Sequence, residues 1–316
     1  MKGWITIVGI LFYTNIFAQQ DQKKIFNKEF SLVSDDDAYL LQRRDKYYTA
    51  GTFFTINIAK EKNGLKKMDS YELGQMLYTP LKPINPSNNV IDRPFCGFLY
   101  LKFSESFFTK KDAIINYGIA IGTLGNASLA EATQTTVHRV FGLYHFTGWQ
   151  YQIGNSAELN GSFNYAQTLL SDKEYPFFKI VPSLQLNIGT TFTNAKFGNY
   201  FCIGAFEKNS NSALFNSGIN QKKSTIKRNY ELFFYFYPQL IVQGYNATVQ
   251  GCMFGDSNPY AVTSLINTIM YQQTLGFVYA KNRWSTKIEF VYQTKECASQ
   301  SITQHYGSLK LAYRFN

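Results

Sequence analysis

Charged residues and histidine are both scarce in this sequence. Only 16% of the 316 residues are Asp, Glu, Lys or Arg, whereas aromatic residues reach 17%. A water-soluble globular protein carries about 25% charged residues, so we expect part of this surface to face something other than water. Histidine occurs three times, and a catalytic role for histidine therefore depends on very few positions.

Cysteine is also rare, and the sequence lacks the common catalytic motifs. None of the four cysteines forms a C-x-x-C pair, which argues against zinc and redox chemistry. There is no Ser-nucleophile elbow, P-loop or HExxH motif. An oxidising compartment permits disulfides, but spacing alone leaves open whether these cysteines pair or remain free thiols. They are Cys96, Cys202, Cys252 and Cys297.

Long hydrophobic runs are absent beyond the N-terminus. Lys2 precedes a short apolar run, Trp4–Phe12, and Ala18 is followed by polar residues. This pattern predicts a secretory signal peptide at residues 1–18, because the run is too short to span a bilayer as a helix. We expect the mature chain, Gln19–Asn316, to form a single domain.

The charges that are present are predominantly basic. Lys and Arg outnumber Asp and Glu by 31 to 21, which gives a formal charge of +10. Such a charge suits anionic partners, such as the phosphates of lipopolysaccharide, acidic lipid or nucleic acid. Export disfavours nucleic acid. A basic protein without an anionic partner is the alternative.

The chain alternates between apolar and polar residues in segments of about ten residues. In the last of them, Tyr306–Phe315, aliphatic and aromatic residues occupy one face, and polar and basic residues occupy the other. An outer-membrane barrel with a polar lumen and a lipid-facing wall requires this pattern, although a soluble sandwich strand can show it as well.

These segments predict an all-β fold, an antiparallel transmembrane β-barrel of about twelve strands. Three polar segments, Glu61–Lys67, Lys82–Asn89 and Asn209–Ser224, are expected to be extracellular loops. The predicted strands lie at Phe30–Val33, Thr52–Ile58, Gly97–Phe103, Ile114–Ile121, Glu158–Thr168, Ile180–Gly189, Tyr200–Phe206, Tyr230–Tyr237, Gln239–Gln250, Gln272–Tyr279, Ser285–Thr294 and Tyr306–Phe315.

One segment, Ser128–Phe141, breaks this alternation. Its apolar residues recur at helical spacing, and Glu131, Gln134 and His138 fall together on a different face. The initial serine followed by Glu131 resembles a capping box, and Gly142 is a typical helix end. We predict one short amphipathic helix, packed on or beside the barrel.

Gln134 and His138 are the main candidates for catalysis, since they project from one side of this helix. A histidine with a pKa near 6.5 can act as general base on a water molecule. Gln134 could orient that water or a substrate carbonyl. A surface histidine without a role is the alternative, and spacing alone favours it.

The run Asp35-Asp36-Asp37 is rich in the hard oxygen ligands that Ca²⁺ prefers, but it lacks the spacing of an EF-hand. A solvated turn is the alternative. Thr49 could offer a hydroxyl or carbonyl oxygen to a cation, or it could be an ordinary strand threonine.

Arg93 and Trp149 are candidate substrate-binding residues. Arg93 could bind a phosphate in bidentate fashion, or it could pair with Asp92 inside the barrel. Trp149 could form the wall of a site, or it could anchor the protein at the membrane interface. We expect His145 and His305 to be structural, because they lack partners nearby in sequence.

Taken together, these motifs resemble the outer-membrane lipid A 3'-O-deacylase (LpxR) family over nearly the whole mature chain. Several motifs in the right order are more specific than any one alone. The motifs are Asp36-Asp37-Ala38-Tyr39, Asp45-Lys46-Tyr47-Tyr48-Thr49-Ala50-Gly51, Gly74-Gln75 with Tyr78-Thr79-Pro80, Asp92-Arg93-Pro94-Phe95, Gln134 with His138, Gly148-Trp149 with Gln152, and Tyr306-Gly307-Ser308 to Tyr313-Arg314-Phe315.

The resemblance implies a monomeric twelve-stranded barrel in the outer membrane of a Gram-negative bacterium, with a site between the wall and a helix near the outer rim. It implies Ca²⁺-dependent removal of the 3'-linked acyl chain of lipid A. His138 would be the base, assisted by Gln134. Asp37 and Thr49 would form or support the Ca²⁺ site, and Asp36 would lie at the oxyanion.

Three positions depart from the family pattern. The family usually shows Asn-Asp where this chain has Asp36-Asp37, and an extra carboxylate could tighten Ca²⁺ binding but would repel an oxyanion. Ala50 replaces a polar residue, and Ser156 replaces an acid after Asn155. Two alternatives therefore stay open: a non-catalytic barrel, such as a porin, scaffold or lipid-binding protein, and an esterase that acts on phospholipid.

Overall fold

The computed structural model describes residues 25–41, 45–81, 91–143, 147–171, 177–221, 228–256 and 258–316. The predicted signal peptide, the predicted loop Lys82–Asn89 and His145 lie outside these residues. No helix in the described part of the chain is long and apolar enough to cross a membrane.

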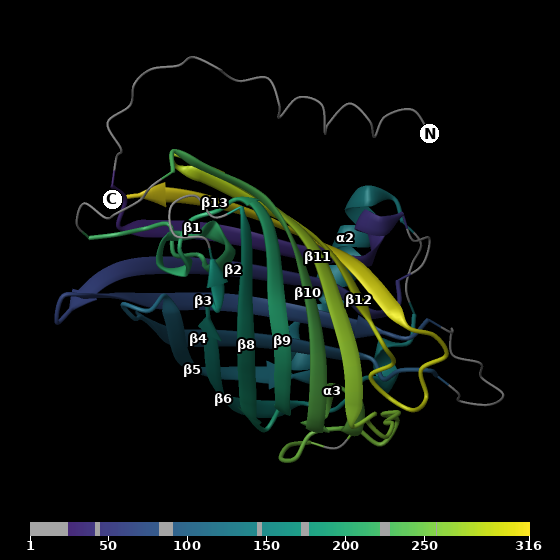
Figure 1. Ribbon diagram of the computed structural model, residues 1–316. Helices are drawn as coiled ribbons and strands as arrows, with labels where there is room; N and C mark the ends of the chain where they lie inside the picture. Colours follow the sequence, from purple (N-terminus) through teal and green to yellow (C-terminus); the bar gives the residue numbers. More distant parts are fainter. Residues whose placement is uncertain are drawn as a thin grey trace.

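Twelve long antiparallel strands form a closed barrel (Figure 1). Strand β1 pairs with β13 and β6 pairs with β8, so the sheet closes on itself. Closure leaves no long sheet edge to aggregate, and a two-residue strand, β7 (Leu170–Ser171), adds to β8. The long strands are β1 (Lys28–Asp36), β2 (Tyr47–Lys62), β3 (Leu65–Thr79), β4 (Cys96–Phe108), β5 (Ala113–Leu124), β6 (Ser156–Gln167), β8 (Phe178–Gly189), β9 (Phe192–Ala205), β10 (Tyr230–Asn246), β11 (Ile269–Lys281), β12 (Trp284–Gln293) and β13 (Gln304–Phe315).

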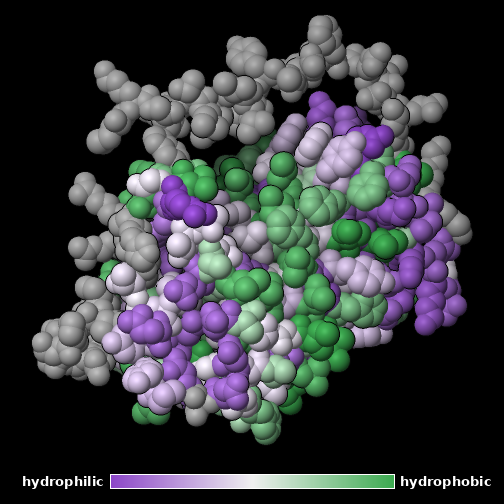
Figure 2. Space-filling model, turned by 180° about the vertical axis from the view of Figure 1, so that it is seen from behind, coloured by the Kyte–Doolittle hydropathy of each residue, from purple (hydrophilic) through white to green (hydrophobic). Residues whose placement is uncertain are grey.

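The alternating pattern sorts side chains between the lumen and the outside, as predicted. In β13, Leu309 and Leu311 are exposed, whereas Lys310 and Arg314 are buried. On the face shown in Figure 2, hydrophobic residues gather in a central band with hydrophilic residues on either side. This arrangement suits a wall that meets lipid and two ends that meet water.

The two ends of the barrel differ. Strand β1 begins at the same rim at which β13 and the chain end, and we call this the inner rim. The opposite rim, here the outer rim, carries the segments between β3 and β4, between β5 and β6 and between β10 and β11, which are three of the four longest connections. Long connections at the outer rim are typical of outer-membrane barrels.

The predicted strand count is right, but two strands were assigned wrongly. Strand β3 was missed, because Glu61–Lys67 is a tight hairpin and not a loop. Asn63 and Gly64 form its two-residue turn with φ of 52° and 72°, the geometry that favours Asn-Gly. Strand β10 is continuous through Pro238, where the sequence suggested two strands, and residues 247–250 form a short helix, α3 (Ala247–Gln250).

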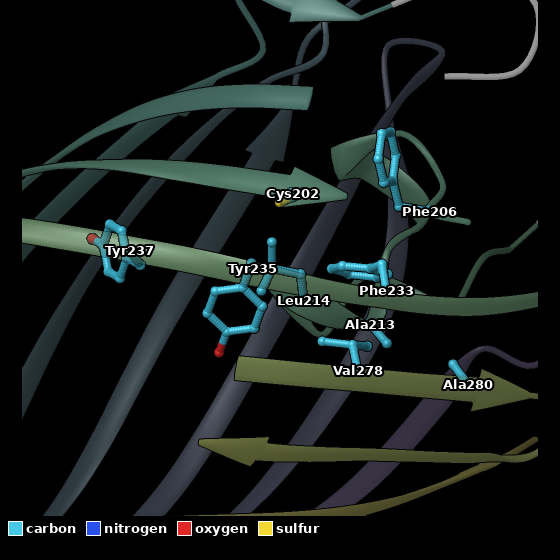
Figure 3. Close-up of a cluster of buried hydrophobic side chains, with 9 residues drawn as sticks. All are labelled: Cys202, Phe206, Ala213, Leu214, Phe233, Tyr235, Tyr237, Val278 and Ala280. Atoms are coloured by element: carbon cyan, nitrogen blue, oxygen red, sulfur yellow. The ribbon is translucent and has the colours of Figure 1, made fainter. Parts of the chain in front are cut away.

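The segment Asn209–Ser224 is not an extracellular loop. It follows β9 at the inner rim, and its described part folds into the lumen. Lys66 of β3 donates to the carbonyls of Ser210 and Ser217, at 2.6 and 2.5 Å. Phe206, Ala213 and Leu214 pack on wall residues such as Phe233 and Val278 (Figure 3).

One group of buried charges in the lumen joins β1 to β13. Glu29 of β1 is fully buried and accepts a hydrogen bond from Arg314 Nε at 3.1 Å. Lys310 Nζ lies 3.8 Å from the same carboxylate and also donates to Asn216 of the inserted segment. One carboxylate therefore balances two cations between the first and last strands.

We expect Glu29→Ala to destabilise the barrel by about 3–5 kcal/mol, because it leaves two buried cations without their anion. Urea unfolding in detergent, followed by tryptophan fluorescence, measures this change. Lys111→Ala removes an exposed charge and serves as control. Equal midpoints for the two variants would contradict the proposed role of Glu29.

Candidate active site at the outer rim

The predicted helix is present as α2 (Ala130–Phe141), and Gly142 ends it in the left-handed conformation, with φ of 65°. The predicted capping box is wrong. Ser128 belongs to a preceding 3-10 turn, η3 (Gly125–Ser128), and its hydroxyl donates to the carbonyl of Gly125. Leu129 occupies the N-cap position with φ of 60° and no side-chain cap.

Two strand residues hold the start of α2 against the wall. Gln75 of β3 donates from Nε2 to the carbonyl of Ser128 at 2.7 Å. A Cβ atom at Gly97 of β4 would overlap the side chains of Ser128 and Ala130. Gln75, from the Gly74-Gln75 motif, therefore anchors the helix.

Helix α2 buries two polar residues and exposes several apolar ones. Gln134 and His138 are buried, whereas Val140 and Phe141 are exposed. Glu131 was expected on the face of Gln134 and His138 but is exposed. The helix thus directs an amide and an imidazole toward the barrel.

Both side chains meet one carboxylate, that of Asp45, which lies just before β2. Gln134 Nε2 donates to Asp45 Oδ2 at 2.7 Å, and His138 Nε2 lies 3.1 Å from the same oxygen. Trp149 Nε1 donates to Gln134 Oε1 at 2.8 Å. A chain of hydrogen bonds therefore runs from Trp149 through Gln134 to Asp45 and back to the helix at His138.

The Asp45 contact can orient the imidazole. An ionised carboxylate can only accept hydrogen bonds, so beside an ionised Asp45 the Nε2 of His138 would be the donor. A carboxylate that orients a histidine in this way is a recurrent feature of general-base sites.

Asp37 lies beside this group. Its side chain is 2% exposed, and its Oδ2 accepts the backbone N–H of Lys46 at 2.9 Å. Burial, followed by the neighbouring carboxylates of Asp45 and Asp36, raises the pKa of Asp37 to about 8. Several carboxylates crowded in a buried place are a setting in which a bound cation would be favourable.

Asp36 begins the 3-10 turn η2 (Asp37–Leu40). Its Oδ1 accepts the backbone N–H of Ala38 at 2.7 Å, as an N-cap residue does. Asp45 and His138 are both close enough to act electrostatically on its carboxylate. The acidic run and the histidine, about one hundred residues apart in sequence, therefore converge at the outer rim.

The donors at this place fit Ca²⁺ in chemical type. In the described part of the chain, no three His, Cys, Asp or Glu residues are arranged to hold a metal ion. Ca²⁺, however, takes six to eight oxygen ligands, including carbonyl and hydroxyl oxygens and water. Thr49 is buried, and its hydroxyl lies 2.6 Å from that of Thr79, a contact that uses only part of its hydrogen-bonding capacity.

The structure corrects both expectations for Arg93. This residue is fully buried, and its Nε and NH2 donate to Glu296 Oε2 at 3.1 and 2.8 Å. NH2 also donates to Thr248 Oγ1 at 2.9 Å, and the guanidinium stacks on Tyr78. Asp92 instead accepts from the hydroxyl of Tyr47 at 3.0 Å. Arg93 thus holds rim loops together and is not placed to meet a phosphate.

Trp149 lies beside Gln134 and is buried, so it is not an interface anchor. It is 2% exposed and packs on Phe95 with ring centroids 5.3 Å apart. Ser156 stands where the resemblance led us to expect an acid, and its hydroxyl donates to Glu158. The acidic residue at this end of β6 is therefore Glu158, two residues after Ser156.

Two partners were not predicted from sequence: Asp45, which contacts Gln134 and His138, and Glu296, which contacts Arg93. Asp45 is part of a quoted motif, but nothing in sequence indicates which residues its carboxylate meets. The four cysteines, whose pairing the sequence left open, are all free thiols.

We expect Gly97→Ala to displace the start of α2, because the added methyl group would overlap Ser128 and Ala130. Hydrogen exchange of the α2 amides, measured by mass spectrometry, should become at least several-fold faster. Gly161→Ala is the matched control, since a Cβ there meets nothing closer than 3.6 Å. Equal α2 protection in the two variants would contradict this packing.

Comparison with known proteins supports the same architecture. The family described as "Outer membrane protein LpxR" matches residues 5–315. Among solved structures, LpxR from Salmonella typhimurium superposes with a TM-score of 0.74 at 17% identity, covering 91% of this chain and all of that one. The beta domain of the Bordetella autotransporter BrkA has a TM-score of 0.48 at 7% identity, covering 92% of this chain and 99% of that one.

A search of curated proteins finds no match. The family match nevertheless extends over almost the entire chain, and the barrel closes with the twelve strands expected of it. The chain is a member of the LpxR family and an outer-membrane β-barrel protein of a Gram-negative bacterium.

Proposed function

We propose that this protein is a Ca²⁺-dependent ester hydrolase that removes the 3'-linked acyl chain of lipid A, with His138 as general base. Membership of the LpxR family supports a lipid A deacylase-type function in the outer membrane. The observation that carries the catalytic part is the Asp45 carboxylate, which contacts both His138 and Gln134.

The histidine would activate water. With Nε2 bonded to Asp45, the lone pair of Nδ1 would accept a proton from a water molecule as its oxygen attacks the ester carbonyl carbon. The imidazolium formed is stabilised by the adjacent carboxylate. It then returns the proton to the departing alkoxide of the sugar, which becomes an alcohol as the acyl chain leaves as a carboxylic acid and then ionises in water.

Gln134 and Trp149 act as positioning residues. Trp149 holds the amide oxygen of Gln134 at 2.8 Å, which directs the amide nitrogen at Asp45. Asp45 is thereby held from two sides, and His138 with it. A base that keeps one orientation loses less entropy when the reaction begins.

Asp37 and Thr49 would hold Ca²⁺ together with oxygens of the backbone, water or substrate. When bound, the ion would stabilise the negative charge that develops on the carbonyl oxygen. The buried carboxylate of Asp37, with its pKa raised to about 8, supports this assignment, because a cation would offset the repulsion from Asp45 and Asp36.

The main test uses purified protein in detergent with intact lipid A and Ca²⁺. Wild type should release free fatty acid, and EDTA should stop the release. His138→Ala should lower the rate by about 10²-fold or more, since a positioned base contributes at least that much. Mass spectrometry of the lipid A and of the released acid identifies the ester that is cut.

Glu131→Ala, an exposed position on the same helix, is the control and should retain the wild-type rate. Equal rates for wild type and His138→Ala would exclude the mechanism. Release from phospholipid but not from lipid A would favour the phospholipid esterase. No release from either lipid would favour a non-catalytic barrel.

Asp36→Asn tests the departure from the family pattern. Asparagine can still cap η2, and its amide could donate to a developing oxyanion that an ionised carboxylate repels. We expect kcat to rise about tenfold, a fraction of what one oxyanion donor contributes, and the Ca²⁺ concentration for half-maximal rate to rise as well. Asp36→Ala removes both cap and donor and should not raise kcat. An unchanged or lower kcat for Asp36→Asn would argue against a place for Asp36 at the oxyanion.

A further inference from the structure

An apolar groove crosses the outside of the barrel wall. It has a volume of about 720 Å³, extends from β9 to β13, and reaches Tyr39 and Leu40 of η2 at one end. Most of its apolar lining residues, such as Leu275 and Phe290, are exposed on the outside of the wall. This volume is typical of ligand-binding pockets.

The groove follows a row of register partners across the strands. Phe201 pairs with Phe236, Phe236 with Leu275, Leu275 with Phe290, and Phe290 with Gly307. Gly307 is the fourth residue of β13 from the outer rim, whereas Phe201 is the tenth residue of β9 from the same rim. The groove therefore starts near the rim and descends along the wall, as the tilt of barrel strands requires.

The upper end of the groove adjoins the candidate site. Gly307 pairs with Asp36 across β1 and β13, and a Cβ atom at Gly307 would lie 2.8 Å from the Cβ of Tyr39. The hydroxyl of Tyr39 is 2.8 Å from that of Ser34. Tyr39 thus closes the groove only two residues after the Asp37 carboxylate.

We propose that this groove holds the acyl chain whose ester is cleaved at the His138 site, and that its depth selects the length of that chain. The inference rests on the proposed function. The apolar lining suits hydrocarbon. A lipid of the outer leaflet has its ester near the rim and its methyl end within the membrane, and the groove runs in the same direction.

Membrane lipid would also contact this wall, but its contacts would not depend on the connection between the groove and the candidate site. An acyl chain held in the groove places its carbonyl end beside η2. A shorter chain would leave the lower part of the groove, near Phe236 and Phe201, unfilled. Chain length should therefore affect binding and turnover together.

Leu275→Trp tests the inference by filling the groove at mid-depth. The matched control is Ile121→Trp on β5, which is also exposed on the outer wall but lies outside the groove. Heat-modifiability in SDS gels confirms that both variants fold. The substrates are lipid A with a 3'-linked tetradecanoyl chain and its analogue with an octanoyl chain.

We expect Leu275→Trp to lower the ratio of tetradecanoyl to octanoyl release by about tenfold, within the range for a few methylene groups in an apolar pocket. Ile121→Trp should keep the wild-type ratio. The same ratio in all three proteins would overturn the groove inference and leave the proposed hydrolysis intact.

A binding experiment separates the two proposals. In the His138→Ala background, Leu275→Trp should weaken binding of the tetradecanoyl lipid about tenfold relative to Ile121→Trp, measured by native mass spectrometry in detergent. If Leu275→Trp weakens binding but the wild-type protein hydrolyses no lipid, the groove inference is supported and the proposed function is excluded. Equal binding by both variants, or no binding by either, would overturn the groove inference.

Discussion

The Asp45 carboxylate is the contact on which the arrangement at the outer rim depends. It accepts from Gln134 and lies within hydrogen-bond distance of His138, two residues of α2 that would otherwise be buried polar groups at a cost in free energy. The next residue, Lys46, donates its backbone N–H to Asp37. One short segment between β1 and β2 thus joins the helix to the end of the first strand, and it brings a base and a buried carboxylate to the same place.

The same region brings three carboxylates close together. Asp36, Asp37 and Asp45 act on one another electrostatically, an arrangement that costs stability unless protons, cations or hydrogen bonds offset it. Clusters of this kind gather at functional sites more often than elsewhere. The buried pair of Arg93 and Glu296 is different, because each charge has a direct opposite partner. It stabilises the loops around the site, and its full burial explains why an arginine in a quoted motif need not touch substrate.

Much of the fold could be predicted from sequence, and the errors have physical causes. The alternation of apolar and polar residues identified the strands of the wall, because burial on one face is a local property of each strand. Strand β3 was missed because its charged start follows a two-residue turn directly, and β10 was divided because proline cannot donate a ladder hydrogen bond. At the site, the spacing of Gln134 and His138 could be read from one helix. Their partner could not, because Asp45 is 93 residues from His138, and Arg93 and Glu296 are 203 residues apart.

The orientation of α2 follows from the same rule as the strands. In a water-soluble protein, an amphipathic helix buries its apolar side, but α2 buries Gln134 and His138 and exposes Val140 and Phe141. The strands show the same inversion, with Lys310 and Arg314 inside and Leu309 and Leu311 outside. Both observations are expected where the exterior is lipid and the interior is polar. Gln134 and His138 therefore face the wall against which Gln75 and Gly97 hold the helix, and both contact the Asp45 carboxylate there.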